Sequence, residues 1–342
     1  MRVILKGVLI CLVGLAIVSF PRASHFRKHT GRAGVVAVSA EARYFVSVDD
    51  DETVRIWNAD ARKELSVLAQ KSRQIRSVVF SPDCKMIAGG DDKHNVIVWA
   101  VADGKELFRF RGHTREVVTI TFSPDCKMLV SGSTDQTVKI WDLETLKEAL
   151  TIQSGYDFLA SVAFHPDGKL FASGGQTGDG NEIQLRDVKT GKVHLSWKEP
   201  RGPIRRVGFS PDGKVLYSAN SKLSLWDVAT GRQRDCECPE WFEDGELLHA
   251  LAFSPDSRTL VAGHDVAIGL WDVASGKNTR AFGDRGPNPY LSFADRFLLD
   301  PKEQRFPFLA AAAFKPNGDL MVLGVRGETV ALWRLTSVPQ KK

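Results

Sequence analysis

The stretch from residue 112 to residue 142 alternates between short apolar runs and turn-forming residues. Val117 to Phe122 mixes apolar, β-branched and polar side chains, and Met128 to Ser131 and Thr137 to Trp141 form two further runs. Runs of this length and composition predict half-buried β-strands. Ser123-Pro124-Asp125 separates the first two runs, and proline followed by aspartate favours a tight turn. The stretch therefore predicts three antiparallel strands joined by hairpins.

The same pattern recurs along almost the whole chain after residue 22. The third run of each copy ends at an equivalent position about every 40 to 45 residues, with one longer step before the last copy. These positions are Trp57, Trp99, Trp141, Arg186, Trp226, Trp271 and Trp333. The first turn also recurs, at residues 81–83, 123–125, 165–167, 210–212, 254–256 and 315–317, and is degenerate at Ser39-Ala40-Glu41. Such repetition predicts one repeat architecture rather than separate domains.

One copy carries the markers of a known family. It opens with Gly112-His113, closes with Trp141-Asp142 and contains the Ser-Pro-Asp turn. It resembles one repeat of the WD-repeat β-propeller family. With seven copies, the resemblance implies an all-β, seven-bladed WD-repeat β-propeller over residues 23–342. It also implies a ring closed by pairing of the N- and C-terminal strands, with Ala23 to Lys28 as the outermost strand of the last blade, because closure removes exposed sheet edges.

The first 22 residues have a different character. Arg2 and Lys6 supply positive charge, and Gly7 to Phe20 is an uncharged, mostly apolar run. A positive start before a short apolar core is typical of a signal peptide, and the run could just span a membrane as a signal anchor. We therefore expect an N-terminal apolar leader over residues 1–22 and an extracytoplasmic propeller, either secreted or tethered to the membrane by this segment alone.

The cysteines favour the alternative, a cytoplasmic protein. Cys236 and Cys238 stand two residues apart, where a disulfide would be strained, and two cysteines alone make a poor zinc site. We expect free thiols, which argues mildly against an oxidising compartment.

The net charge is too small to indicate a nucleic-acid partner. The chain has 46 lysines and arginines against 41 aspartates and glutamates, spread along its length, so we expect protein partners and no nucleic acid.

A set of polar residues repeats with the blades. In the family a buried hydrogen-bond network joins the histidine of Gly-His, a serine or threonine of the second strand, the aspartate of the second turn and the tryptophan. The resemblance places this structural network in the third copy and, in part, in the first. The residues are His113, Ser131 or Ser133, Asp135 and Trp141, with His29, Asp51 and Trp57 in the first copy. The set has the composition of a hydrolase triad, but its recurrence and expected burial favour a structural role.

Other chemistry is sparse, and we predict no catalytic residue, metal site or cofactor. The glycine-rich segment 174–181 lacks the Lys-Ser/Thr ending of a phosphate loop and joins two strands. Asp49-Asp50-Asp51 lies in a tight turn without a spaced set of ligands.

Three insertions lengthen the repeat, at residues 175–182, 235–249 and 283–307. Successive hairpins of a blade alternate between the two faces of the disc, so all three are expected on one face, where the chain enters the first strand of each blade. We call it the loop face. Loops on a rigid scaffold commonly carry binding sites, and aromatic residues are enriched at interfaces. The expected partner-binding residues are Arg32, Arg73, Arg115, Asp157, Phe158, Trp241, Phe242, Tyr290, Phe293, Phe297 and Phe308.

These residues divide the loop face into two arcs. The arginines of blades one to three form a basic arc, and the residues of blades four, six and seven form an acidic and apolar arc. We expect a non-enzymatic scaffold for protein–protein interactions that binds through the loop face as a monomer within a complex. The alternative is a propeller that binds a small ligand, or acts as an enzyme, through its central channel.

Overall fold

The computed structural model describes residues 24–27, 33–49, 53–68, 75–200, 202–220, 222–234, 236–237, 248–264, 267–283, 308–326 and 329–335. The expected leader, residues 1–22, lies outside these ranges. The described residues contain strands and no helix, so none of their elements is a helix long and apolar enough to cross a membrane.

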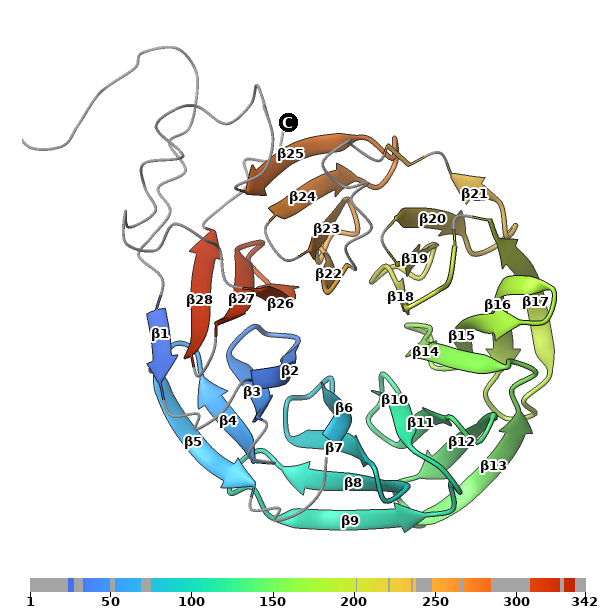
Figure 1. The fold of residues 1–342 in the computed structure, drawn as a ribbon, viewed down its shortest axis with the longest axis horizontal. Helices are drawn as coiled ribbons and strands as arrows, with labels where there is room; N and C mark the ends of the chain where they lie inside the picture. The colour runs from blue at the N-terminus through green and yellow to red at the C-terminus, as the bar shows by residue number, and fades with distance from the viewer. Residues whose placement is uncertain are drawn as a thin grey trace, which may run out of the picture.

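The described strands form seven four-stranded antiparallel sheets arranged as a ring, which Figure 1 shows from one face. We number these blades in chain order. Blade one contains β2 (Ala33–Val38), β3 (Tyr44–Asp49), β4 (Val54–Asn58) and β5 (Lys63–Leu68). Blade two contains β6 (Ile75–Phe80), β7 (Met86–Asp91), β8 (Asn95–Ala100) and β9 (Glu106–Arg111). Blade three contains β10 (Val117–Phe122), β11 (Met128–Ser133), β12 (Thr137–Asp142) and β13 (Lys147–Gln153).

The remaining blades follow the same order. Blade four contains β14 (Phe158–Phe164), β15 (Leu170–Thr177), β16 (Gly180–Asp187) and β17 (Val193–Glu199). Blade five contains β18 (Arg206–Phe209), β19 (Val215–Ala219), β20 (Leu223–Asp227) and β21 (Gln233–Arg234). Blade six contains β22 (Ala250–Phe253), β23 (Thr259–His264), β24 (Ala267–Asp272) and β25 (Asn278–Gly283). Blade seven contains β26 (Phe308–Phe314), β27 (Leu320–Arg326), β28 (Thr329–Leu335) and, from the other end of the chain, β1 (Ser24–Arg27).

The last sheet joins the two ends of the described chain. Strand β1 pairs with β28 in antiparallel fashion, with Ser24 opposite Leu332 and Arg27 opposite Thr329. In every other blade the four strands follow one another along the chain. The pairing of β1 with β28 gives blade seven its fourth strand on the outside of the ring (Figure 1).

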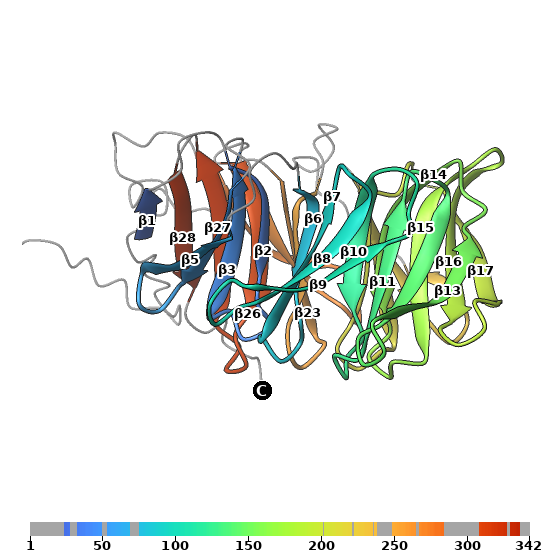
Figure 2. The ribbon, with the colours of Figure 1, turned by 90° about the horizontal axis from the view of Figure 1, so that it is seen from below.

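The register of each blade defines the two faces of the disc, which Figure 2 shows from the side. In blade three, Val117 at the start of β10 lies opposite Ser133 at the end of β11, while Phe122 lies opposite Leu129. The turn between the second and third strands therefore lies on the loop face, and the Ser-Pro-Asp turn lies on the opposite face.

The hydrophobic core is divided into layers between neighbouring blades. Among the described residues there are seven such clusters, and each joins two adjacent sheets. The layer between blades one and two packs Ile56 and Leu68 against Phe80 and Trp99. The layer between blades seven and one packs Trp57 against Met321 and Leu332. Because each blade buries both faces against its neighbours, no blade has a complete core of its own.

The turns on the opposite face are satisfied by their own residues. In blade three the Ser123 hydroxyl donates to Asp125 at 2.5 Å and accepts from the Met128 amide at 2.9 Å. The residue after each such turn has a positive φ, which glycine tolerates best. Blade four has Gly168 there, with φ of 71°, whereas blade three has Cys126, with φ of 61°. Cys126 thus stands at a turn position that favours glycine.

Candidate functional site

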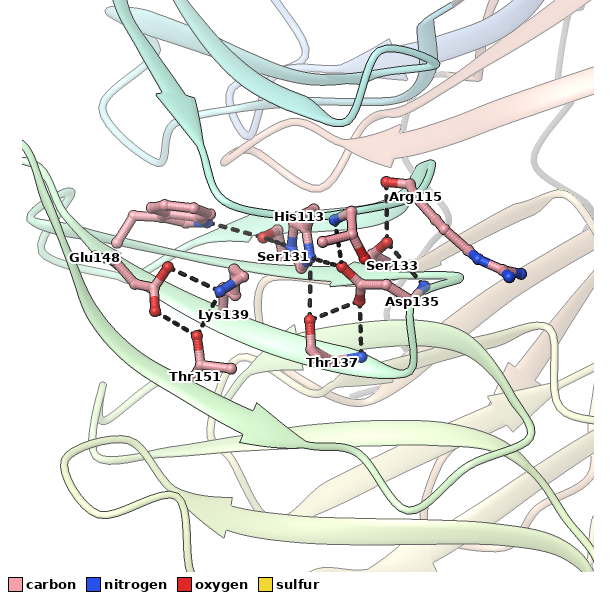
Figure 3. A network of polar contacts seen from close by, with 11 residues as sticks. His113, Arg115, Ser131, Ser133, Asp135, Thr137, Lys139, Glu148 and Thr151 are labelled. Carbon is pink, nitrogen blue, oxygen red and sulfur yellow. Dashed lines mark hydrogen bonds and ion pairs between the residues drawn. The ribbon is translucent and has the colours of Figure 1, made fainter.

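Blade three contains a continuous buried chain of polar groups, shown in Figure 3. The Trp141 indole donates from Nε1 to the Ser131 hydroxyl at 2.8 Å, and that hydroxyl lies 2.8 Å from His113 Nε2. The other ring nitrogen, His113 Nδ1, lies 2.9 Å from Asp135 Oδ2. A single tautomer satisfies every contact, with Ser131 donating to Nε2 and Nδ1 donating to Asp135. This series of hydrogen bonds thus links the loop face to the interior of the sheet.

Asp135 is the centre of this network. Besides His113, its carboxylate accepts from the Thr114 amide at 2.9 Å, the Thr137 amide at 2.9 Å and the Thr137 hydroxyl at 2.6 Å. Burial alone would raise the pKa of Asp135, but hydrogen bonds from Thr137, Thr114 and His113 lower the pKa to about 2. Burial lowers the pKa of His113, against the opposing effect of Asp135. At neutral pH the pair is therefore a carboxylate and a neutral imidazole.

The geometry of this set suits a structural network better than a nucleophile. Ser131 has no exposed surface, and its hydroxyl bridges the Trp141 indole and the His113 ring. A nucleophilic serine needs an open approach for the substrate, as well as a neighbouring base. The geometry also distinguishes the two candidate serines. Ser133 donates to the Arg115 carbonyl at 3.1 Å and accepts from the Asp135 amide at 3.1 Å, so it holds the backbone of the second turn.

Blade one repeats one step of this chain. Trp57 donates from Nε1 to the Ser47 hydroxyl at 2.7 Å, and Ser47 is buried. Ser47 therefore has the place of Ser131. The other two residues expected here, His29 and Asp51, lie outside the described residues.

Blade four builds the same position from different side chains. Tyr156, which is buried, donates to the Ser173 carbonyl at 2.8 Å and lies 3.1 Å from the Ser173 hydroxyl. Tyr156 thus occupies the place of His113, and Arg186 occupies the place of Trp141. The Arg186 guanidinium donates to the Gly191 carbonyl at 2.9 Å and to the Ser154 carbonyl at 3.0 Å. Burial raises the pKa of Tyr156 and keeps the phenol neutral.

Blade five uses a buried carboxylate. Glu199, at the end of β17, is 5 % exposed and accepts hydrogen bonds from the hydroxyls of Ser218 and Ser224. The Trp226 indole donates to the same Ser218 hydroxyl at 2.8 Å. Glu199 therefore has the role that His113 has in blade three. It also lines a shallow surface recess together with Ile204 and Lys222.

The loop face at blades three to five exposes aromatic and charged side chains. Phe158, the first residue of β14, is 43 % exposed, and Arg115 and Asp157 are also exposed. The Arg205 guanidinium, just before β18, lies 5.9 Å from the centre of the Phe158 ring. In blade two, Arg76 pairs with Glu116 of blade three at 3.7 Å. Aromatic and charged groups are therefore displayed together at the ends of the innermost strands.

The comparisons with known proteins agree with this architecture. The family model "WD domain, G-beta repeat" matches residues 21–58, 62–99, 104–142 and 148–181. Four stretches of the chain therefore match WD repeats, and over them the chain is similar to the WD-repeat β-propeller family. The all-β propeller expected from the repeats is thereby confirmed, with the family model matching the first four copies.

Several curated WD-repeat proteins are similar to parts of this propeller. The small ribosomal subunit protein RACK1 of Drosophila melanogaster is 27% identical over 137 residues, which are 40% of this chain and 38% of that protein. Subunit I of eukaryotic translation initiation factor 3 of Candida albicans is 29% identical over 138 residues, 35% of this chain and 39% of that protein. Telomerase protein component 1 of Rattus norvegicus is 25% identical over 187 residues, 47% of this chain and 7% of that protein. The matched stretches of the chain thus span well under half the length of these relatives.

The structure places only part of the expected partner-binding set. Arg115, Asp157 and Phe158 lie on the loop face, and Phe308 begins β26. Arg32, Arg73, Trp241, Phe242, Tyr290, Phe293 and Phe297 lie outside the described residues. Blade five was not part of either predicted arc. It adds the exposed residues Arg205 and Arg206 to the loop face. The acidic and apolar arc is therefore interrupted by two arginines, of which Arg205 lies against Phe158. The signal was present as the Arg205-Arg206 pair, but its position next to Phe158 depends on the packing of two blades.

No metal-binding cluster appears in the described part of the chain, where no three histidine, cysteine, aspartate or glutamate side chains are grouped to hold an ion.

Proposed function

We propose that this propeller is a non-enzymatic scaffold that binds other proteins through its loop face. The observation that carries the proposal is the contrast between the two faces. On the opposite face, the Ser-Pro-Asp aspartates bind within their own turns, as Asp125 does with Ser123 and the Lys127 amide. On the loop face, Phe158, Arg115 and Arg205 are exposed at the ends of rigid strands. Exposed aromatic and arginine side chains on a rigid frame are common anchors of interfaces.

The names of two relatives support a role within an assembly. One is a small ribosomal subunit protein, and another is a subunit of an initiation factor. These names describe components of larger complexes, and we extend that kind of role, though not those partners, to this chain. The propeller would act as one copy within such a complex.

Site-specific photo-crosslinking tests which face binds. A photoreactive residue replaces Gln136 or Lys222, which are exposed on the loop face, or Lys85 or Lys127, which are exposed on the opposite face. We expect proteins crosslinked in cells to be recovered reproducibly from the first pair of positions and not from the second. Recovery from the opposite face alone would show that the wrong face has been chosen. Recovery of a small molecule, with no protein, would instead favour the central-channel alternative.

We also propose that residues 1–22 direct the propeller out of the cytoplasm. The proposal rests on the positive start and the apolar run of this segment. Fractionation of cells, with sequencing of the mature N-terminus, tests it, because a full-length chain in the cytoplasmic fraction would contradict export.

A further inference from the structure

Phe158 and three arginines lie at the loop-face ends of the innermost strands of blades three, four and five. Phe158 begins β14, and the inner blade-five strand is preceded by Arg205 and begins with Arg206. Arg115 of blade three precedes β10 at the equivalent end. All four side chains are exposed, and the Arg205 guanidinium lies over the Phe158 ring. We call this group the Phe158 surface.

The three arginines of the Phe158 surface carry charge that the protein does not neutralise locally. Within the described ranges, the side chains of Arg115, Arg205 and Arg206 have no hydrogen-bond or ion-pair partner, unlike Arg76, which pairs with Glu116. Exposed Lys222 on the second turn of blade five adds a fourth positive charge nearby. A positive group that remains unpaired beside an aromatic ring is suited to a partner's carboxylates.

The acidic residues of this face limit how a partner would lie. Asp157 and Asp179 are exposed on blade four. A negatively charged segment would therefore place its carboxylates over the arginines of blades three and five, and not over these two aspartates. The contact between Arg205 and Phe158 leaves the ring partly exposed, and this exposed part can receive an apolar side chain.

We propose that the Phe158 surface binds an acidic linear segment of a partner protein, with an apolar side chain of that segment on Phe158 and its carboxylates on Arg205, Arg206 and Arg115. This proposal rests on the proposed function, because it names the partner class for the loop face. The arginines orient the segment and speed its encounter, and the aromatic contact holds it.

A random library of 12-residue peptides displayed on phage tests the proposal with the full-length chain. We expect the enriched peptides to have a net negative charge and at least one large apolar residue. A synthetic, fluorescein-labelled copy of the most enriched peptide should bind more weakly as salt is raised, because the arginines are exposed to screening. Its dissociation constant should rise at least tenfold for Phe158→Ala and for the pair Arg205→Gln and Arg206→Gln.

Matched controls separate these effects from changes in folding. Val193→Ala removes an exposed apolar side chain from the outer strand of the same blade, and Lys169→Gln with Arg258→Gln removes two exposed positive charges from the opposite face. Both controls should bind like the wild type, and all variants should retain the wild-type melting temperature. Enrichment of neutral or basic peptides would overturn the inference, and so would wild-type affinity in the Phe158 and arginine variants. If crosslinking from Gln136 and Lys222 still recovers proteins, the proposed function survives that failure.

Discussion

In blade three, a tryptophan at the end of the third strand reaches a buried serine, whereas in blade four an arginine stands at the same position and reaches the backbone instead. Trp141 and His113 both bind the Ser131 hydroxyl. In blade four Tyr156 lies 3.1 Å from the Ser173 hydroxyl, and Arg186 donates to two carbonyl oxygens. Both arrangements give the buried serine and the neighbouring carbonyl oxygens hydrogen-bond donors, as burial requires.

The comparison shows which property of the repeat is required. The requirement is a filled volume with satisfied polar groups, and the identity of the side chains can change while both conditions hold. Blade five gives a third solution, with Glu199 in the place of His113. Loss of the histidine from a repeat therefore does not mean loss of its network.

The largest expected effect comes from removing the arginine of blade four. Arg186→Ala removes a buried positive group and leaves the carbonyls of Ser154 and Gly191 without their donor. We expect the free energy of unfolding to fall by about 3 kcal/mol, since hydrogen bonds to charged groups are among the stronger ones. Urea denaturation measures it. Arg232→Ala is the control, because Arg232 is exposed and should change stability by less than about 0.5 kcal/mol. An equal, small effect for both variants would show that Arg186 is not part of the core.

Breaking the network of blade three should have the next largest effect. His113→Ala or Asp135→Ala leaves buried partners unpaired, and each should cost about 1–3 kcal/mol of unfolding free energy. The double variant should cost less than the sum of the two, because both residues act in one network. Glu144→Ala is the control, since its ion pair with Lys127 is exposed and contributes little. Unchanged melting temperatures for both single variants would contradict the buried network.

The strands and turns of both blades could be predicted from the sequence, because short alternating runs and Ser-Pro-Asp turns leave local signals. The choice between Ser131 and Ser133 could not be made, since residues two apart share a face of the strand. Position along the strand decides it, and Ser131 alone is opposite the histidine ring. Tyr156 and Glu199 were missed because they replace histidine by another chemical type. The proximity of Arg205 to Phe158 depends on how neighbouring blades pack, which no local pattern records.

The pH dependence of stability should also differ between the two blades. Burial lowers the pKa of His113 below its ordinary 6.5, so the unfolded chain takes up this proton before the folded one. The contribution of His113 is therefore complete above pH 6.5 and declines as the pH falls through the lowered value. Tyr156 in blade four has no proton to gain in this range. Melting temperatures from pH 7.5 to 5 should fall more steeply for the wild type than for His113→Gln. Parallel curves would show that the ring is protonated equally in both states.

The smallest effect concerns the turn that precedes the second strand in each blade. Gly168 in blade four and Cys126 in blade three both have a positive φ, at 71° and 61°. A side chain at this φ is strained, so Gly168→Ala should lower the free energy of unfolding by about 1 kcal/mol. A new Cβ at Gly168 would meet no atom closer than 3.7 Å, so the loss would come from the backbone and not from a clash. Cys126→Ala should change stability by less than about 0.5 kcal/mol, because the folded protein already bears that strain. Thermal unfolding of the two variants side by side measures the difference, and equal losses would show that the two turns do not share this backbone constraint.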